Sequence, residues 1–303
     1  MVKHVVLVIG KGGVGKTTVS ILLSLVLSNL GDTLLYSLDP AKHLIKYLGI
    51  DKAMKYYKVT GKLSAYQLDL DIAIREISEH YVGLMKELSP SLSVLNLDNI
   101  INTIKYSPGV EEEVFVRELH KIYNVDDYDY ALVDTPPTGI TLRTLMMPKL
   151  YKTWIEKLIE VRERIVSLRY TIARTLGKEF RVEDPVLEKL YGLQKMYGTL
   201  WEWVGSSKTS FVIVANPEMM PVLEIYDVIK FLNTEIGVEP KLLVMNKYVN
   251  TPESEEALRE FNKLHHNKVY IPKVDRPPSN LNDMIELLKY IDNDLVLRAF
   301  KSN

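Results

Sequence analysis

Short apolar runs rich in β-branched residues alternate along the chain with longer segments whose apolar residues recur every three or four positions. Runs of the first kind are typical of strands buried on both faces of a parallel sheet. They predict strands at residues 4–10, 33–40, 63–71, 128–139, 210–218, 240–248 and 267–274. Because helical segments separate these runs, we expect an α/β fold with a doubly wound, mostly parallel sheet.

Two long segments, residues 72–127 and 141–208, depart from this alternation because they are almost wholly helical in pattern. In the second, the repeat consists of Leu150, Trp154, Leu158, Val161, Ile165, Leu168 and Ile172, and Tyr151, Ile155, Ile159 and Val166 widen it. We expect a single domain, 1–303, whose sheet is interrupted by a helical subdomain formed from both segments. Periodicity alone leaves open whether this apolar row is buried core or an exposed groove.

The chain has 303 residues, a formal net charge of −1 and no cysteine. Without cysteine, disulfides, cysteine zinc sites, iron–sulfur clusters and a cysteine nucleophile are all excluded. The net charge gives no sign of attraction to nucleic acid or to an anionic membrane surface. No segment approaches the roughly 20 apolar residues of a membrane-spanning helix. We therefore expect a soluble, cytoplasmic protein.

Residues 10–17, GKGGVGKT, match the phosphate-loop pattern G-x-x-x-x-G-K-[ST] and lie between a predicted buried strand and a predicted helix. Backbone N–H groups of such a loop and of the helix that follows it form an anion site. The predicted nucleotide contacts are Gly12, Gly13, Val14, Gly15, Lys16, Thr17 and Thr18. Lys16 is expected to bridge the β- and γ-phosphates of ATP, and the Thr17 hydroxyl is expected to bind Mg²⁺.

Polar residues also follow three other predicted strands, at the sheet edge where ligands of open α/β sheets bind. Asp39 is placed to orient or deprotonate an attacking water, and Asp134 is placed to hold Mg²⁺. Asn246 and Lys247 form a candidate base-reading pair, because a carboxamide both donates to and accepts from a purine edge. Helix capping is the alternative for Asp39 and for Asn246.

Six motifs occur in one order along nearly the whole chain: GKGGVGKTT, LDPA, SPGVEEEVF, DTPPTGITLRTLMMP, the PE of VANPEMMPVLE, and NK after the next strand. In these motifs the chain resembles the ArsA/Get3 (TRC40) family of deviant Walker A ATPases. The resemblance implies that Lys11 reaches across a homodimer to the partner's nucleotide, with the logic of an arginine finger. It also implies that Asp39 serves the hydrolytic water, that Asp134 belongs to switch II, and that Asn246 frames adenine together with Pro272 and Lys273.

The chain departs from that family pattern at both switches and at the zinc motif. Family members usually read D-P-A-H-N-L-S-D in switch I, where this chain has DPAKHLIK at residues 39–46. Pro136 and Ile140 stand in switch II where alanine and histidine are usual. Because the C-x-x-C motif is absent, the zinc ion that joins the two subunits in many family members cannot bind here. A homodimer must therefore close by other contacts.

We consider three candidate functions for such an ATPase. A targeting factor would hold hydrophobic segments of tail-anchored membrane proteins in its helical subdomain and hand them to a membrane receptor. The methionines of that subdomain, Met85, Met146, Met147 and Met196, suit a surface that accepts varied helices. The ATPase subunit of an arsenite efflux pump would need thiolates for As(III), which this chain lacks.

The third candidate is a spatial organiser of the MinD/ParA kind. Such proteins typically carry a C-terminal amphipathic membrane helix or a basic DNA-binding surface, whereas residues 283–303 mix both charge signs and read as a helix packing on the sheet. The large insertion after Arg143 also speaks against an organiser. We therefore predict a Mg²⁺-dependent homodimeric ATPase that handles hydrophobic protein segments and no nucleic acid.

Overall fold

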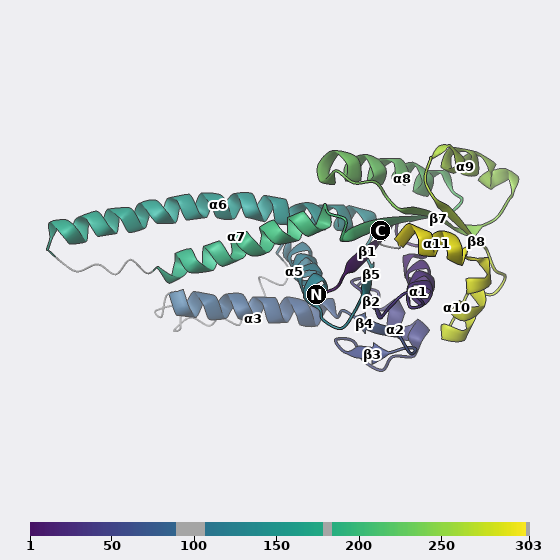
Figure 1. Cartoon of the computed structure of the whole chain (residues 1–303), viewed down its shortest axis with the longest axis horizontal. Helices are drawn as coiled ribbons and strands as arrows, with labels where there is room; N and C mark the ends of the chain where they lie inside the picture. The colour runs from purple at the N-terminus through teal and green to yellow at the C-terminus, as the bar shows by residue number, and fades with distance from the viewer. Residues whose placement is uncertain (89–106, 178–183, 301–303) are drawn as a thin grey trace.

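The computed structural model describes residues 1–88, 107–177 and 184–300. Its centre is a sheet of strands β1 (His4–Gly10), β2 (Thr33–Ser37), β3 (Tyr56–Lys58), β4 (Leu63–Gln67), β5 (Tyr130–Asp134), β6 (Thr209–Ala215), β7 (Leu242–Tyr248) and β8 (Lys268–Pro272). The strand order is β3-β4-β2-β5-β1-β6-β7-β8, and all pairs are parallel except β3 with β4 (Figure 1). The predicted α/β fold with a mostly parallel sheet is confirmed.

The predicted strands differ from the observed ones at their carboxyl ends and at one edge. Residues 38–40, 68–71, 135–139 and 216–218 lie beyond the last residue of their strands. Strand β3 was not predicted, because this short, largely exposed edge strand lacks the apolar run that marks a buried strand. The candidate site residues lie at these carboxyl ends, with Asp134, Asn246, Lys247 and Pro272 among the last residues of their strands and Asp39 and Lys273 just beyond.

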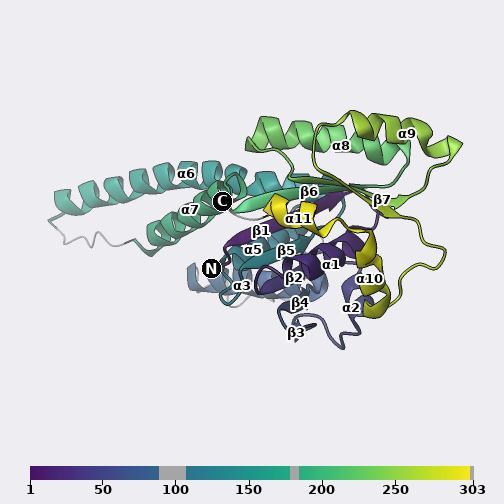
Figure 2. The same ribbon diagram turned by 45° about the vertical axis from the view of Figure 1, so that its right-hand side comes forward.

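Helices cover both faces of the sheet, as a doubly wound fold requires (Figure 2). One apolar core packs against α1 (Lys16–Leu27), α2 (His43–Leu48), α10 (Leu281–Leu287) and α11 (Asn293–Phe300). The other includes residues of α3 (Leu70–Leu88), α5 (Val110–Asn124), α6 (Thr138–Thr175), α7 (Pro185–Val204), α8 (Met219–Phe231) and α9 (Pro252–Lys263). A π-helical turn, Leu232–Ile236, extends α8, and a 3₁₀ turn, Leu288–Tyr290, follows α10.

The C-terminal segment forms two short helices rather than one. Met284 and Leu287 of α10 and Val296 and Phe300 of α11 are buried in the core that contains α1. The apolar spacing of this segment is therefore used largely for packing inside the molecule, as predicted.

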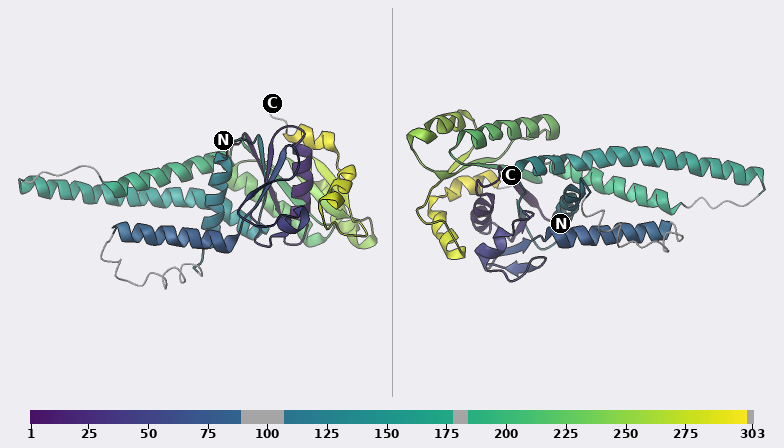
Figure 3. Two further views of the ribbon diagram at one scale, coloured as in Figure 1. Left: turned by 90° about the horizontal axis from the view of Figure 1, so that it is seen from below. Right: turned by 180° about the vertical axis from the view of Figure 1, so that it is seen from behind.

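Helices α6 and α7 form a long arm that projects from the sheet, and α3 runs beside it (Figures 1 and 3). Asp184 caps the start of α7, since its side chain accepts hydrogen bonds from the backbone N–H groups of Val186 and Leu187. Arg162 of α6 donates to the same carboxylate at 2.8 Å and holds its pKa below the usual range. Helices α5 and α7 lie within the two predicted helical segments, and α3 and α6 begin two and three residues before them, in the predicted strands 63–71 and 128–139. Residues 89–106 and 178–183 lie outside the described part of the chain.

The predicted apolar row of α6 is exposed. Trp154, Leu168 and Ile172 keep 61%, 64% and 58% of their surface accessible, and Leu150, Leu158, Val161 and Ile165 are exposed as well. Ile155 and Ile159 lie on a different side of the helix and are buried in the core. Helix α6 therefore has two apolar sides, and only one of them is covered within the described chain. None of the described helices combines the length and apolar character needed to cross a bilayer.

Candidate nucleotide-binding site

The loop from β1 to α1 has, at two positions, a backbone conformation that residues with a side chain rarely adopt. Gly13 and Gly15 have φ of +86° and +90°, in the left-handed region. A Cβ on Gly15 would lie 2.2 Å from the Asn246 Nδ2 atom. Gly15 is also the N-cap of α1, where no side chain caps the helix and no acidic residue lies in the first turn. The N–H groups at this helix start are thus available to an anion.

Lys16 lies against the loop in a buried position. Its ammonium group donates to the Gly10 carbonyl at 2.9 Å and to the Lys11 carbonyl at 3.3 Å. Burial lowers the pKa of Lys16, although the nearby Asp134 and Asp39 oppose this effect. A phosphate placed at the loop would give this desolvated cation a full counter-charge in place of two carbonyl dipoles. Thr17 is buried beside it, and Thr18 is half-buried in the same turn of α1.

Asp134, the last residue of β5, is fully buried. Its Oδ2 atom accepts hydrogen bonds from the Thr17 hydroxyl at 2.8 Å and from the Ser37 hydroxyl at 3.1 Å. Its Oδ1 atom has no hydrogen-bond partner among the described residues. Burial raises the pKa of Asp134 to about 6, and the charge of Asp39 adds to this effect.

This carboxylate and the Thr17 hydroxyl suit Mg²⁺. Both supply hard oxygen atoms, which this ion prefers. The unpartnered Oδ1 atom is a buried acceptor that a cation would satisfy. The residues present therefore fit the ion that the sequence predicted for Thr17 and Asp134.

Asp39 lies half-buried just beyond β2 and does not cap a helix. Its Oδ1 atom accepts from the Ala41 backbone N–H at 3.0 Å, whereas α2 begins at His43 with Lys42 in the N-cap position. The capping alternative is therefore wrong for Asp39. Lys42 forms an ion pair with Asp69 at 2.6 Å and lowers the pKa of that carboxyl group. Lys42, one of the departures in switch I, thus ties this segment to the loop after β4.

Asn246 and Lys247, at the end of β7, contact the phosphate loop from outside. The Asn246 Nδ2 atom donates to the Val14 carbonyl at 2.8 Å, and the Lys247 ammonium group donates to the Gly13 carbonyl at 3.0 Å. Asn246 is followed by no helix until α9, so it caps none. Its amide group therefore supports the loop, in addition to any contact with a base.

A hollow of about 400 Å³ lies next to this pair. Its lining includes Lys247, Lys273 and Asn216, together with Val249 and Thr251. Pro272 ends β8, and the Lys273 backbone N–H donates to the Tyr248 carbonyl at 2.8 Å. The structure thus brings Asn246, Lys247 and Lys273, three of the four residues predicted to contact the base, to the loop or to this hollow, and Pro272 directly precedes Lys273.

Lys11 lies apart from the other predicted residues. Its side chain is exposed on the rim of the loop, and its ammonium group forms no hydrogen bond or ion pair with any described residue. The exposed Gly12 follows it. The position leaves the Lys11 side chain accessible to a second molecule.

Two polar residues of this site were missed in the sequence. Ser37 donates to Asp134 because it ends β2, in register with Asp134 on the neighbouring strand β5. Asn216 follows β6 directly, and its buried Oδ1 atom has no partner in the described chain. Both stand at carboxyl ends of predicted parallel strands, so the signal that identified Asp134 was present for them too.

Replacement of Asn246 by alanine tests whether this side chain only supports the phosphate loop or also contacts the base. We expect the affinity for inorganic tripolyphosphate, which has no base, to fall by about tenfold because the Val14 carbonyl loses its donor. We expect the affinity for ATP to fall further because the base loses a contact. Titration calorimetry with both ligands measures the two losses, and equal losses would contradict a base-reading role.

Comparison with known proteins agrees with this arrangement. Residues 3–282 match the profile of the ArsA ATPase family, described as anion-transporting ATPases. A putative arsenical pump-driving ATPase 2 of Aquifex aeolicus is 29% identical, covering 82% of each chain. The ATPase GET3 of Malassezia globosa is 28% identical over 80% of this chain and 72% of its own, and the ATPase GET3A of Arabidopsis thaliana is 26% identical over 82% and 68%. The predicted family is confirmed: this chain belongs to the anion-transporting (ArsA) ATPase family and is an ATPase.

Proposed function

We propose that this protein is a cytoplasmic, Mg²⁺-dependent ATPase that alternates between an open and a closed homodimer and captures the transmembrane segments of tail-anchored proteins. A membrane receptor that takes over the captured segment is part of the proposal, and nucleic acid is not. The observation that carries it is the exposed apolar row of α6, from Leu150 to Ile172. Two of the relatives carry the name ATPase GET3 or GET3A.

In this proposal the phosphates of ATP lie in the loop, against its N–H groups and the Lys16 ammonium group. Thr17 and Asp134 hold Mg²⁺, which when bound neutralises negative charge on the phosphates. Asp39 orients the attacking water, since its Oδ2 atom is not used in the Ala41 turn. Lys11 of each copy adds a positive charge at the other copy's nucleotide only when the dimer closes.

Helix α6 connects the proposed nucleotide site with the apolar row proposed to bind the captured segment. It begins at Thr138, just after Asp134, and continues without interruption through the apolar row to Thr175. Near its start, Arg143 pairs with Glu112 of α5 at 3.2 Å, and the Tyr197 hydroxyl of α7 donates to Glu113 of α5 at 3.2 Å. A displacement at Asp134 would thus reach the arm through one helix and two polar contacts.

The apolar row, rather than the methionines, supplies the surface for a captured segment. Met147 and Met196 pack against the core and Met146 is half-buried, while the side chain of Met85 lies outside the described part of the structure. The row is made of leucine, isoleucine, valine and tryptophan side chains that remain in water in the isolated chain. Covering them with another apolar helix would be favourable at about 25 cal/mol per Å² buried.

Replacing Trp154 and Leu158 by serine tests this surface. We expect co-expression with a tail-anchored protein to yield a soluble, ATP-sensitive complex for the parent, and at least about tenfold less of it for the variant. The control is Ile285→Ser, which removes an exposed apolar side chain from α10. Because all three side chains are exposed, the melting temperature and the basal ATPase rate should not change. An unchanged yield of complex would contradict the proposal.

The two other functions find less support. An arsenite pump would require soft ligands for As(III), and the chain contains no cysteine. A spatial organiser typically carries a C-terminal amphipathic membrane helix or a basic DNA-binding surface, whereas the buried residues of α10 and α11 pack in the core and the formal net charge is −1.

A further inference from the structure

The last part of α6, residues 164–176, which we call the arm tip, differs in charge from the rest of the molecule. It contains Arg164, Arg169 and Arg174 and no acidic residue, in a chain whose formal net charge is −1. Its apolar side chains Ile165, Leu168, Ile172 and Leu176 are all exposed. We propose that the arm tip docks onto the surface of an anionic lipid bilayer. This inference goes beyond the proposed function and does not depend on it.

The apolar and basic side chains of the arm tip are arranged along the helix in the pattern of an interfacial helix. With 3.6 residues per turn, Ile165, Leu168 and Ile172 form one row. By the same geometry, Arg164 lies on one flank of this row and Arg169 on the other. Apolar side chains on such a helix enter the boundary between headgroups and acyl chains, while flanking cations meet the lipid phosphates.

The arginines of the arm tip are not neutralised within the described chain. Closer to the sheet, Arg162 is paired with Asp184, and Lys157 is paired with Glu160 at 2.8 Å. Arg164, Arg169 and Arg174 form no ion pair or side-chain hydrogen bond with a described residue. An ionised guanidinium group attracts phosphate strongly, and it is free to do so here.

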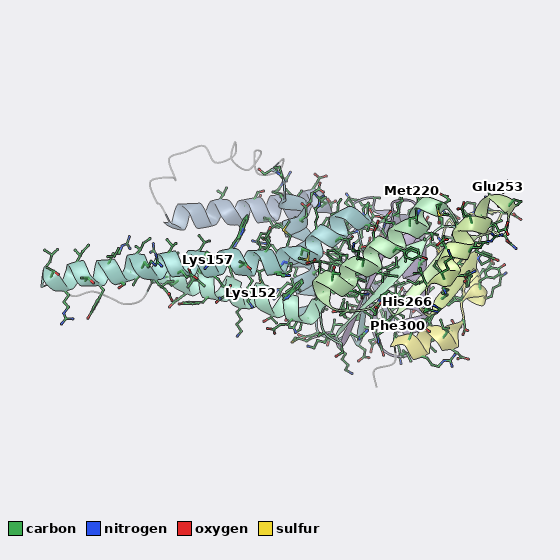
Figure 4. The ribbon with its side chains drawn as sticks, turned by 90° about the horizontal axis from the view of Figure 1, so that it is seen from above. Lys152, Lys157, Met220, Glu253, His266 and Phe300 are labelled. Atoms are coloured by element: carbon green, nitrogen blue, oxygen red, sulfur yellow. The ribbon has the colours of Figure 1, made fainter. Side chains whose placement is uncertain are left out.

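The shape of the arm makes the tip accessible to a flat surface. Helix α6 extends further from the sheet than either α7 or α3 in Figures 1 and 3, so its last turns are not covered by the described parts of those helices. In Figure 4, Lys157 marks the middle of the projecting arm, far from Met220 on α8. A bilayer could therefore contact the arm tip without contacting the nucleotide site.

The charge of the arm tip favours binding to a lipid surface over binding to a second copy of the chain or to a captured transmembrane segment. A second copy of the chain, packed row against row, would bring arginine flanks to arginine flanks, and like charges repel. A captured transmembrane segment needs an apolar surface but no basic flanks. That description fits the part of the row nearer the sheet, where Glu156 and Glu160 are interspersed with lysines. An anionic bilayer satisfies the apolar and the basic side chains together.

Vesicle flotation of the full-length protein, without nucleotide or client, tests this inference. The probes are vesicles of phosphatidylcholine alone and vesicles in which about a third of the lipid is phosphatidylglycerol. We expect the protein to float with the anionic vesicles only, and less so as salt is raised. The double variant Arg164→Gln/Arg169→Gln should partition at least about tenfold less. The control, Lys58→Gln/Lys230→Gln, removes two exposed charges from β3 and α8 and should partition like the parent.

A second variant, Leu168→Ser/Ile172→Ser, should also weaken flotation while leaving the melting temperature unchanged, because both side chains are exposed. The inference is overturned if the parent does not float with anionic vesicles, or if the arginine variant floats as the parent does. It is also overturned if the arginine variant floats normally but loses its complex with a tail-anchored protein, since the arginines would then serve protein capture. Loss of flotation by the arginine variant, with normal capture of a tail-anchored protein, supports the inference. If the parent captures no tail-anchored protein, the proposed function fails, and the flotation results still test the inference.

Discussion

Replacing Lys16 by alanine is expected to abolish ATP binding and to lower the ATPase rate by about 10³-fold or more. The Lys16 ammonium group is buried, and it already binds the Gly10 and Lys11 carbonyls of the loop that would surround the phosphates. Alanine removes the one cation that is fixed inside this loop. Titration calorimetry measures the nucleotide affinity, and phosphate release at an ATP concentration that saturates the parent measures the rate.

Lys11→Ala is the matched comparison, because it removes a lysine from the same loop whose side chain is exposed. If Lys11 acts on the partner copy's nucleotide, this variant should bind ATP normally and hydrolyse it slowly. Mixing Lys11→Ala with a Lys16→Ala protein should then give a higher rate than either variant alone, because in a mixed dimer the intact Lys16 of one copy meets the intact Lys11 of the other. Hydrolysis at the parental rate by Lys11→Ala would refute the role across the dimer, while normal ATP binding by Lys16→Ala would refute the assignment of the loop.

Replacing Asp134 by asparagine is expected to change activity and stability in opposite directions. Hydrolysis with Mg²⁺ should fall by about 10²–10³-fold, because a neutral amide replaces the buried carboxylate proposed to hold the ion. The nucleotide-free protein in EDTA should become more stable by about 1–3 kcal/mol, a rise in melting temperature of about 2–6 °C. The asparagine carbonyl can still accept from Thr17 and Ser37, so the two hydroxyl groups keep their partner.

The stabilisation by Asp134→Asn should depend on pH. Burial raises the pKa of Asp134 from its ordinary value of 3.8 to about 6 in the folded protein. Above pH 6 the folded protein contains an ionised, desolvated carboxylate, so the full cost is present. As the pH falls through 6 toward 4 the folded protein takes up this proton and the cost disappears. The gain in stability over the parent should therefore be largest near pH 7 to 8 and vanish near pH 4.

Thermal unfolding of both proteins across this range gives the measurement. Ser37→Ala is a useful control, since it removes one hydrogen bond to the carboxylate without removing the charge, and it should destabilise the protein at neutral pH. A loss of stability in Asp134→Asn at neutral pH would show that the carboxylate is better compensated than its burial suggests.

Local sequence was sufficient to predict most of the sheet and the loop. Seven apolar runs identified β1, β2, β4, β5, β6, β7 and β8, because a strand buried on both faces must be apolar throughout. The phosphate loop was predicted as well, since its glycines, lysine and threonine are adjacent in the chain and need no long-range contact to come together. Strand β3 escaped notice because an exposed edge strand has no such run.

Which polar groups meet was decided by the tertiary structure. Ser37 and Asp134 are 97 residues apart and meet because β2 pairs with β5, while Asn246 reaches the Val14 carbonyl from 232 residues away. A single sequence does not state strand order, so it placed these residues at one sheet edge without naming their partners.

The apolar row of α6 shows the same division most clearly. That Trp154, Leu168 and Ile172 share one side of a helix follows from the sequence and from 3.6 residues per turn. That this side faces water while Ile155 and Ile159 are buried is known from the fold alone, because burial depends on which neighbour packs against a helix and not on the helix itself. Likewise, the three arginines of the arm tip are a property of the sequence, but the lack of a partner for them among the described residues follows from how far α6 extends beyond its neighbours.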